Sequence, residues 1–399
     1  MLKLCKLSIL LFPLLLGWGC SSDSEEVILP NNRFTKVYDN YDFSSSFYPL
    51  DLKQTADGGF LILAQTEVDI SDFGGVYVMK TDDEGNFVWE VPASGFVAPT
   101  SNLMEINGSF YFMCMDPSAS GSYLMKVDEV GQGLQVAGTY GSISYPLSTI
   151  ATPEGGVGVL GFNRDGQSST FSKLKSDFSE DWTQSFQILD DPDEAIFNHL
   201  TNPNKRLPFF VGNLNGGGFY VNGFYNYTLS VMFLDVEGQW TGVMNGFRDD
   251  GAVSAMNHIT GDDFAVSRFT FGKNYVHPRI AIDKAGVSSS EDLEGNEYPE
   301  LQPNANVRIH SMTYESQNLT IYAMDSKSNQ IVLYSYDEDT GELLGNKYLG
   351  FSEGYKIAGL VETADKGMAI AALTYVTGRF PRISLFKISE GDVKKLIGK

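Results

Sequence analysis

The feature that most constrains the fold of this chain is a short turn, followed by an apolar residue, that recurs at nearly even spacing. Neighbouring copies lie 45 to 62 residues apart, with a mean of about 51. Periods of about 40 to 50 residues with short β-segments are typical of propeller blades rather than of helical solenoids. The seven copies are Gly58-Gly59-Phe60, Gly108-Ser109-Phe110, Gly155-Gly156-Val157, Gly217-Gly218-Phe219, Asp262-Asp263-Phe264, Gln317-Asn318-Leu319 and Lys366-Gly367-Met368.

Each repeat also has the same internal order. A second apolar segment ends 16 to 22 residues after the turn, in most repeats at an aspartate such as Asp82, Asp128 or Asp235, and a further turn often containing glycine follows. Aspartate in a turn bonds its own backbone and glycine supplies positive φ, so these segments are predicted hairpins. We call the recurrent turn of each repeat its marker turn. With one more strand before each marker turn, the sequence predicts a seven-bladed β-propeller of four-stranded antiparallel blades. Two domains, such as a pair of sandwiches, are the alternative, but the markers continue without a break across the middle of the chain.

The rest of the pattern is consistent with an all-β chain. Helical periodicity is nearly absent, and the only helical turn is expected over 191–199, in the longest interval. An open blade edge invites aggregation, so the two ends of the chain are expected to meet. We predict that 33–38 completes the last blade beside 383–388, and 393–397 is the competing segment.

The N-terminus predicts an exported, lipid-anchored protein. Lys3 and Lys6 precede an apolar run over 7–16, and Cys20 follows closely; a run this short does not predict a stable membrane span. We expect residues 1–19 to be a lipoprotein signal peptide, 20–32 a lipidated, acidic and flexible tether, and 33–399 the propeller. Gly17 stands where a branched aliphatic residue is usual, so an ordinary signal peptide is the alternative.

Charge and cysteine content exclude several functions. The net charge of −22 becomes −24 when the signal and its two lysines are removed, and such a polyanion repels nucleic acid. Cys114 would then be the only cysteine besides the lipidated one, and its place in an apolar strand predicts a buried thiol. No cysteine-based metal cage can form, and no cofactor or metal is predicted.

The first repeat, TADGGFLILAQT followed by VYVMKTDDEGNFVWE, resembles the DGG-type β-propeller repeats of Bacteroidota surface and secreted proteins. The residues after the predicted lipidation site resemble the surface-export signal of lipoproteins in the same group; they are Ser21, Ser22, Asp23, Ser24, Glu25 and Glu26. The resemblance implies an outer-membrane, lipid-anchored protein exposed at the cell surface. It implies no particular chemistry, because propellers include both enzymes and binding scaffolds.

A search for catalytic motifs finds little. The four histidines, His199, His258, His277 and His310, lie in different repeats without a metal-binding spacing. Acidic pairs such as Asp190-Asp191 are expected to be solvated turns, although a Ca²⁺ ion in an acidic loop is left open. The chain is therefore predicted not to be an enzyme. A hydrolase or lyase using His258, His310 and an aspartate near the channel is the less favoured alternative.

Binding is better supported. In a propeller, the loops between the second and third strands of each blade and those between blades gather at one face. Aromatic and arginine side chains supply most interface hot spots, and many lie in these loops. The predicted binding residues are Tyr145, Tyr225, Tyr227, Arg248, Phe271, Tyr275, His277, Phe351, Tyr355, Tyr375, Arg379 and Phe380. We expect a protein-binding scaffold or accessory subunit of an outer-membrane transport or secretion complex. The alternative is a glycan-binding lipoprotein of a nutrient-uptake system, because sugars stack on the same residues.

Overall fold

The structure is a computed structural model that describes residues 32–39, 45–69, 71–247, 250–351, 354–376 and 380–399. All the described residues belong to one compact unit, Asn31–Lys399. The predicted signal peptide, the lipidation site Cys20 and the export residues lie outside the described part. Within that part, no helix is long and apolar enough to span a membrane.

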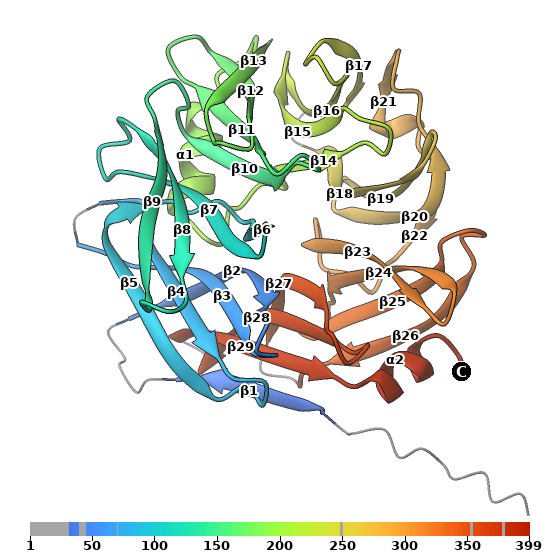
Figure 1. Cartoon of the computed structure of the whole chain (residues 1–399). Helices are drawn as coiled ribbons and strands as arrows, with labels where there is room; N and C mark the ends of the chain where they lie inside the picture. Colours follow the sequence, from blue (N-terminus) through green and yellow to red (C-terminus); the bar gives the residue numbers. More distant parts are fainter. Residues whose placement is uncertain (1–31, 40–44, 70, 248–249, 352–353, 377–379) are drawn as a thin grey trace, which may run out of the picture. The chain divides into compact units, whose positions relative to one another are not determined.

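The described residues form 29 β-strands, two α-helices and one 3₁₀-helix, which confirms the all-β prediction (Figure 1). Four sheets are four-stranded and antiparallel, and two are larger. One of the larger sheets combines the strands of two repeats, and the other includes a strand from the following repeat. The largest sheet follows β2 (Phe47–Gln54), β3 (Phe60–Thr66), β4 (Gly75–Thr81), β5 (Phe87–Val97), β7 (Ser109–Met115), β8 (Ser122–Asp128) and β9 (Gly133–Tyr140), with β6 (Met104–Ile106) beside β7. The next contains β10 (Pro146–Ala151), β11 (Val157–Asn163), β12 (Ser168–Leu174) and β13 (Glu180–Gln187).

The remaining sheets follow the same order along the chain. One contains β14 (Phe210–Asn213), β15 (Phe219–Tyr225), β16 (Thr228–Leu234), β17 (Trp240–Asn245) and β21 (Val287–Ser289). Another contains β18 (Gly251–Thr260), β19 (Asp263–Thr270), β20 (Lys273–Ala281) and β22 (Asn296–Glu297). The last two contain β23 (Val307–Tyr314), β24 (Gln317–Asp325), β25 (Ile331–Asp337) and β26 (Leu343–Leu349), and then β27 (Tyr355–Glu362), β28 (Met368–Val376), β29 (Phe380–Ile388) and β1 (Phe34–Tyr38).

Burial along the strands explains why the sequence folds this way. The second and third strands of a sheet, such as β3 and β4, are buried along almost their whole length, because neighbouring sheets cover both of their faces. Such strands need continuous apolar runs. Fourth strands such as β9, β13 and β26 are mostly exposed or half-buried, and their sequences are correspondingly polar. Cys114 is fully buried within β7, as predicted.

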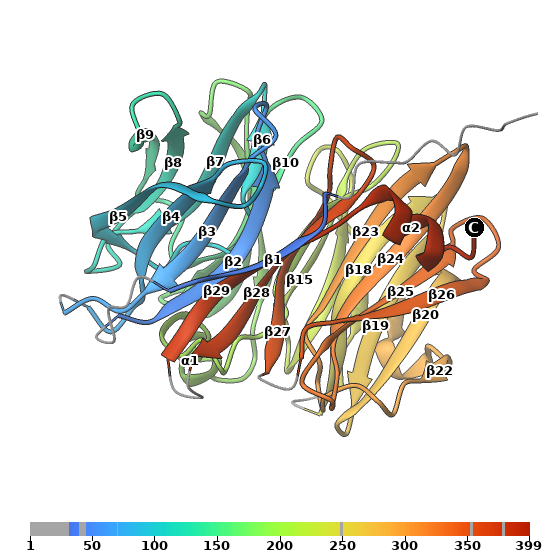
Figure 2. The same ribbon diagram turned by 90° about the horizontal axis from the view of Figure 1, so that it is seen from below.

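The first strands of the sheets contact one another in succession. Contacts run from β2 to β27, β23, β18, β14, β10 and β6, so the sheets pack side by side through their first strands. This packing of antiparallel four-stranded sheets is that of a β-propeller (Figures 1 and 2).

Both ends of the described chain pack on the last sheets. β1 pairs antiparallel with β29, with Phe34 opposite Lys387 and Tyr38 opposite Ile383, which confirms the predicted place of 33–38. The competing segment, 393–397, lies instead in and just after α2 (Glu390–Leu396), which Ser389 caps. Val393 and Leu396 of this helix are buried in the hydrophobic core that the last two sheets share, and the helix contacts β26.

Two irregularities depart from the uniform repeat. β21, with the 3₁₀-helix Ser290–Asp292 after it, leaves its own repeat and pairs in parallel with β17, so that only the two-residue β22 is left as the outer strand beside β20. β5 and β7 also pair briefly, at Val97 and Met115, which joins the first two repeats into one sheet.

Candidate functional site

The predicted binding residues come from connections at one end of the sheets. Consecutive strands of an antiparallel meander alternate in direction, so the connection from second to third strand and the connection to the next sheet leave from the same end. We call this end the loop face. It also carries the helix α1 (Asp193–Thr201), which lies beyond the strand ends in Figure 2 and confirms the helical turn expected over 191–199.

Three of the predicted binding residues are strongly exposed on the loop face. The exposed fractions are 61% for Tyr227, 66% for Phe271 and 74% for Phe351. Phe271 packs against Phe247, another exposed aromatic residue of this face, with ring centroids 5.6 Å apart. Large exposed apolar side chains grouped in this way mark interaction surfaces.

The other predicted residues are less accessible. Tyr145, Tyr225, Tyr275, Tyr375 and Phe380 are half-buried. Tyr225 packs on Trp240, and Tyr275 lies beneath the guanidinium of Arg268 at 4.2 Å. Arg248 and Arg379 lie outside the described residues.

His277 and Tyr355, which the sequence placed on this face, are buried. Tyr355 packs on Phe386 with ring centroids 5.1 Å apart. Burial, and next to it the charge of Arg268, lowers the pKa of His277 to about 4. Both side chains are therefore core groups, because the ends of β20 and β27 continue further into the packed sheets than the loop assignment assumed.

The long connection between β13 and β14, residues 188–209, crosses from one part of the loop face to another. We call it the strap. On one side, Asp193 pairs with Arg164 at 2.7 Å and Ile188 forms a β-bridge with Asn226. On the other side, Phe197 of α1 packs on Phe73, with ring centroids 5.5 Å apart.

The far end of the strap contacts this same sheet again and one further sheet. Arg206 donates a hydrogen bond to the side-chain oxygen of Gln65 in β3, and Asn204 accepts one from Lys356 of β27 at 3.4 Å. A buried histidine fixes this turn, because His199 Nδ1 accepts a hydrogen bond from the backbone N–H of Leu207 at 2.8 Å. The strap thus ties together repeats that are far apart in sequence.

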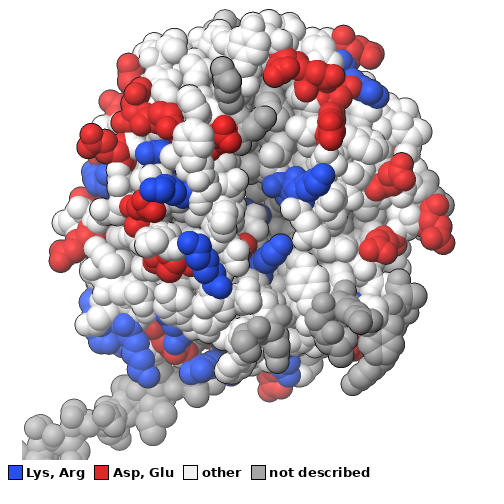
Figure 3. Space-filling view, turned by 180° about the vertical axis from the view of Figure 1, so that it is seen from behind, with Lys and Arg blue, Asp and Glu red and all other residues white. Residues whose placement is uncertain are grey.

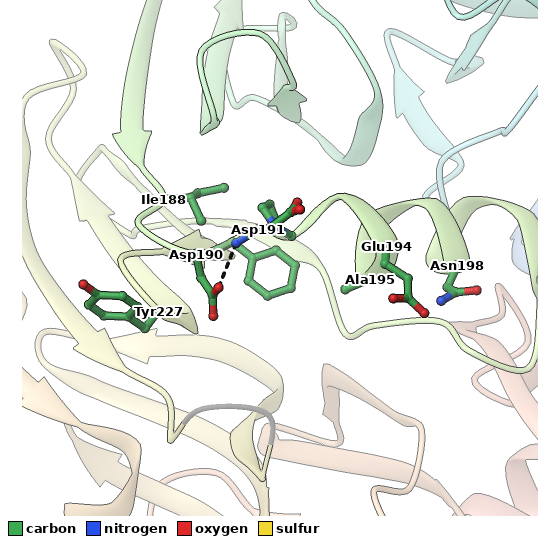
Figure 4. Close-up of a pocket in the computed structure, with 9 residues that line it drawn as sticks. Ile188, Asp190, Asp191, Glu194, Ala195, Asn198 and Tyr227 are labelled. Atoms are coloured by element: carbon green, nitrogen blue, oxygen red, sulfur yellow. Dashed lines mark hydrogen bonds between the residues drawn. The ribbon is translucent and has the colours of Figure 1, made fainter.

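A cavity of about 320 Å³ opens between the strap and Tyr227 (Figure 4). Asp190, Asp191 and Glu194 bring carboxylates to it, and Phe224 and Tyr227 bring aromatic rings. Asp190 Oδ1 also accepts a hydrogen bond from the backbone N–H of Asp191 at 2.9 Å, as the dashed line in Figure 4 shows. The acidic pair Asp190-Asp191, which was expected to be a solvated turn, therefore also forms one wall of a pocket. Carboxylates beside an aromatic ring can bind a sugar by hydrogen bonding and stacking.

Two of the four histidines are held in hydrogen bonds to the backbone. Both ring nitrogens of His258 are used, since Nδ1 accepts from the backbone N–H of Asn215 at 3.0 Å and Nε2 lies 3.0 Å from the carbonyl oxygen of Gly261. His199 bonds within the strap, and burial lowers its pKa to about 3. In the described ranges, no three His, Cys, Asp or Glu side chains lie close enough together to hold a metal ion.

Positive charge is concentrated near the centre of the loop face. Figure 3 views the side of the molecule that carries α1, and Lys and Arg side chains gather there around a central hollow, whereas Asp and Glu lie mostly nearer the edge. This distribution is unexpected for a chain with 28 Lys and Arg against 50 Asp and Glu. The sequence did not predict this group of positive charges, because the Lys and Arg residues that form it are far apart along the chain.

No protein-family model matches the sequence, and no curated protein matches it. Solved structures with a similar fold include hydrazine synthase from Kuenenia stuttgartiensis, with a TM-score of 0.51 and 12% identity over 86% of this chain and 95% of that chain. Raptor from Chaetomium thermophilum has the same TM-score and identity, and this chain matches only 28% of it. The β-propeller domain of the Trilobed protease from Pyrococcus furiosus, described as having an open velcro topology, has a TM-score of 0.47 and 10% identity over 86% of this chain and 95% of that domain. At such low identity, the likeness concerns the fold alone.

Proposed function

We propose that this chain is a non-enzymatic, seven-bladed β-propeller that a lipid on Cys20 holds at the outer surface of the outer membrane, where its loop face binds a protein partner. The observation that carries the proposal is the group of exposed aromatic side chains on that face. Tyr227, Phe247, Phe271 and Phe351 all lie there, on three different sheets or their connections. Aromatic residues supply large contact areas at low entropic cost, which is why they dominate interface hot spots.

Two further observations support this reading. Seven turn markers and the succession of first-strand contacts favour seven blades, with β1 completing the last of them. The hydrogen bonds that occupy both ring nitrogens of His258 favour a structural role over metal ligation or proton transfer.

The binding claim is tested by co-purification of the native lipoprotein in mild detergent. A Phe271→Ala/Phe351→Ala double variant should recover at least tenfold less of a stoichiometric membrane partner than the wild type, since each hot-spot truncation costs about 2 kcal/mol or more and about 1.4 kcal/mol already corresponds to tenfold in affinity. Phe87→Ala is the matched control, because Phe87 is also exposed, at 53%, but follows a turn at the opposite end of its sheet. Equal recovery from all three proteins would exclude the loop face as the binding surface.

The anchoring claim is tested separately. Cys20→Ser should abolish incorporation of labelled fatty acid and release the protein from the membrane fraction, because stable anchoring of a soluble domain needs several acyl chains. Protease treatment of intact cells should digest the wild-type protein. Retention of Cys20→Ser in the membrane without label would contradict lipid anchoring.

Glycan binding is the second candidate, and the cavity beside the strap favours it. Tyr227 would stack on a sugar ring while Asp190 and Glu194 accept hydrogen bonds from its hydroxyl groups. Titration calorimetry against neutral oligosaccharides would then show heats that Tyr227→Ala abolishes, together with monomeric recovery of the protein from membranes.

A further inference from the structure

Four cationic side chains, on the strap and on three adjacent first strands, form no salt bridge in the described part of the chain. They are Lys53 of β2, Arg206 of the strap, Arg308 of β23 and Lys356 of β27, and with His310 we call them the basic cluster. Within the described residues, none of the four cations has a carboxylate at salt-bridge distance, and the contacts of Arg206, Arg308 and Lys356 are to neutral oxygens. Unpaired cations are notable here because acidic residues outnumber basic ones almost two to one.

Hydrogen bonds between elements hold the cluster together. Arg308 Nε donates to the carbonyl oxygen of Ala358 in β27 at 2.8 Å, and Lys356 lies two residues earlier on that strand. Lys356 Nζ in turn donates to Asn204 Oδ1 at 3.4 Å, and Arg206 follows two residues later in the strap. A continuous set of contacts therefore connects β23, β27 and the strap, and it places three cations near one another.

His310 adds a donor on the same strand. Side chains two residues apart on a strand point to the same side, so His310 lies on the side of Arg308. Its Nε2 atom is buried and has no hydrogen-bond partner in the described structure. Burial, and then the charge of Lys53, lowers the pKa of His310 to about 4. Lys53 itself stands opposite Leu61, towards the other end of β2 from the strap.

Two buried carboxylates, Asp51 and Asp325, lie close enough to attract Arg308, but neither forms a salt bridge with it. Asp51 accepts hydrogen bonds from the backbone N–H groups of Leu52 and Leu103, and Asp325 accepts them from Ile357 and the side chain of Asn306. Burial raises the pKa of both carboxyl groups, that of Asp325 to about 6. Their oxygens are therefore occupied by neutral donors rather than by the cations.

The repulsion within the cluster has a cost. Burial, and then the charge of Arg308, lowers the pKa of Arg206 to about 10. Like charges that are removed from water destabilise a fold unless a bound ion of opposite charge neutralises them. Guanidinium groups suit an oxyanion in particular, since their planar fork donates two parallel hydrogen bonds to phosphate or sulfate oxygens.

We propose that the basic cluster is a binding site for a phosphate or sulfate group, held between Arg206 of the strap, Arg308 and Lys356. The group belongs to a small ligand, because the strap spans this part of the loop face. The proposed contacts use neither Phe271 nor Phe351, so the site does not depend on the protein-binding proposal.

The test uses the full mature chain at constant ionic strength. Titration calorimetry with inorganic phosphate, inorganic sulfate, glucose 6-phosphate, glucose 6-sulfate and glucose identifies the source of the oxyanion. We expect saturable binding of at least one charged probe and none of glucose. Preference for a sugar ester over its inorganic ion would assign a modified glycan, and the reverse would assign the free ion.

Variants then place the site. Arg206→Gln and Lys356→Met should each weaken binding about tenfold or more, because a charge-assisted contact is lost. Lys205→Gln is the matched control, since Lys205 is the exposed neighbour of Arg206 in the strap. Thermal unfolding in sulfate against chloride supplies a second measurement: general salt stabilisation persists in the variants, whereas stabilisation through the site disappears.

Two results would overturn the proposal. One is the absence of saturable binding for every charged probe at millimolar concentration. The other is binding that the Arg206 and Lys356 variants, shown to be folded by circular dichroism, leave unchanged.

Discussion

At the scale of single residues, two repeats each have a buried lysine at the corresponding position, and this lysine stabilises the marker turn of its repeat. Lys80 Nζ donates to both carboxylate oxygens of Asp57 at 2.9 Å and to the carbonyl oxygen of Thr81 at 2.8 Å. Lys387 bonds Asp365 in the same way, at 2.8 and 2.9 Å. Because each lysine side chain is almost fully buried, the turn aspartate is its counterion as well as its hydrogen-bond acceptor.

Replacing Asp57 with alanine should therefore destabilise the fold. Loss of a hydrogen bond to a buried charged group costs about 1.5–3 kcal/mol, and we expect the lower end because the Asp57 side chain is itself 66% exposed. Urea unfolding measures the change. Asp83→Ala, in the exposed turn beside it, is the control, and equal stability of the two variants would show that the lysine does not need its partner.

Buried histidines give the stability a pH dependence. Burial lowers the pKa of His199 to about 3 and those of His277 and His310 to about 4. Below the unfolded value of about 6.5, the unfolded chain binds more protons than the folded one, so the free energy of unfolding should fall as the pH drops from about 6.5 towards 4, by up to about 1.4 kcal/mol per pH unit for each histidine. Asp325, with its raised pKa of about 6, acts in the opposite direction over part of this range.

The contribution of one histidine can be isolated. His199→Gln should show a shallower fall of the urea midpoint between pH 6.5 and 5 than the wild type, because one of the three titrating imidazoles is gone. Parallel curves for the two proteins would mean that His199 is not neutral in the folded state.

At the scale of elements, β1 covers an edge that would otherwise be open. It pairs with β29 along its five residues, and an unpaired strand edge is a template for association with another chain. A chain that begins at residue 45 should unfold at a lower temperature than one that begins at residue 32, and it should form dimers or larger species. Sedimentation and thermal scans of the two truncations provide the measurement, and identical behaviour would show that β1 is dispensable.

Local sequence predicts the elements well but not their exceptions. The marker turns, β1 beside β29 and the helix over 193–201 could all be predicted, because each depends on residues that are close in sequence or on a strand edge that must be covered. The move of β21 to the sheet of β17 could not, because it depends on a parallel pairing across repeats. His277 and Tyr355 were assigned to loops because the pattern does not mark where a strand ends.

At the scale of the whole molecule, the sites that matter are assembled from distant parts of the chain. Arg206 meets Gln65 across 141 residues, and Arg308 bonds Ala358 across 50. No periodicity in the sequence brings such residues together, so the basic cluster could be found only in the structure. The exposed aromatics are different, because each lies in a connection whose place the repeat itself predicts, although Phe247 and the strap residue Phe197 escaped notice.

The central claim is that the loop face, rather than the opposite end of the sheets, carries the binding surface. Hydroxyl-radical footprinting of the protein in native outer membranes, compared with the purified protein, tests it directly because aromatic side chains are the main targets. We predict protection of Tyr227, Phe271 and Phe351 in the membranes, with Phe87 oxidised equally in both samples. Equal oxidation of all four residues, or protection of Phe87 alone, would contradict the claim.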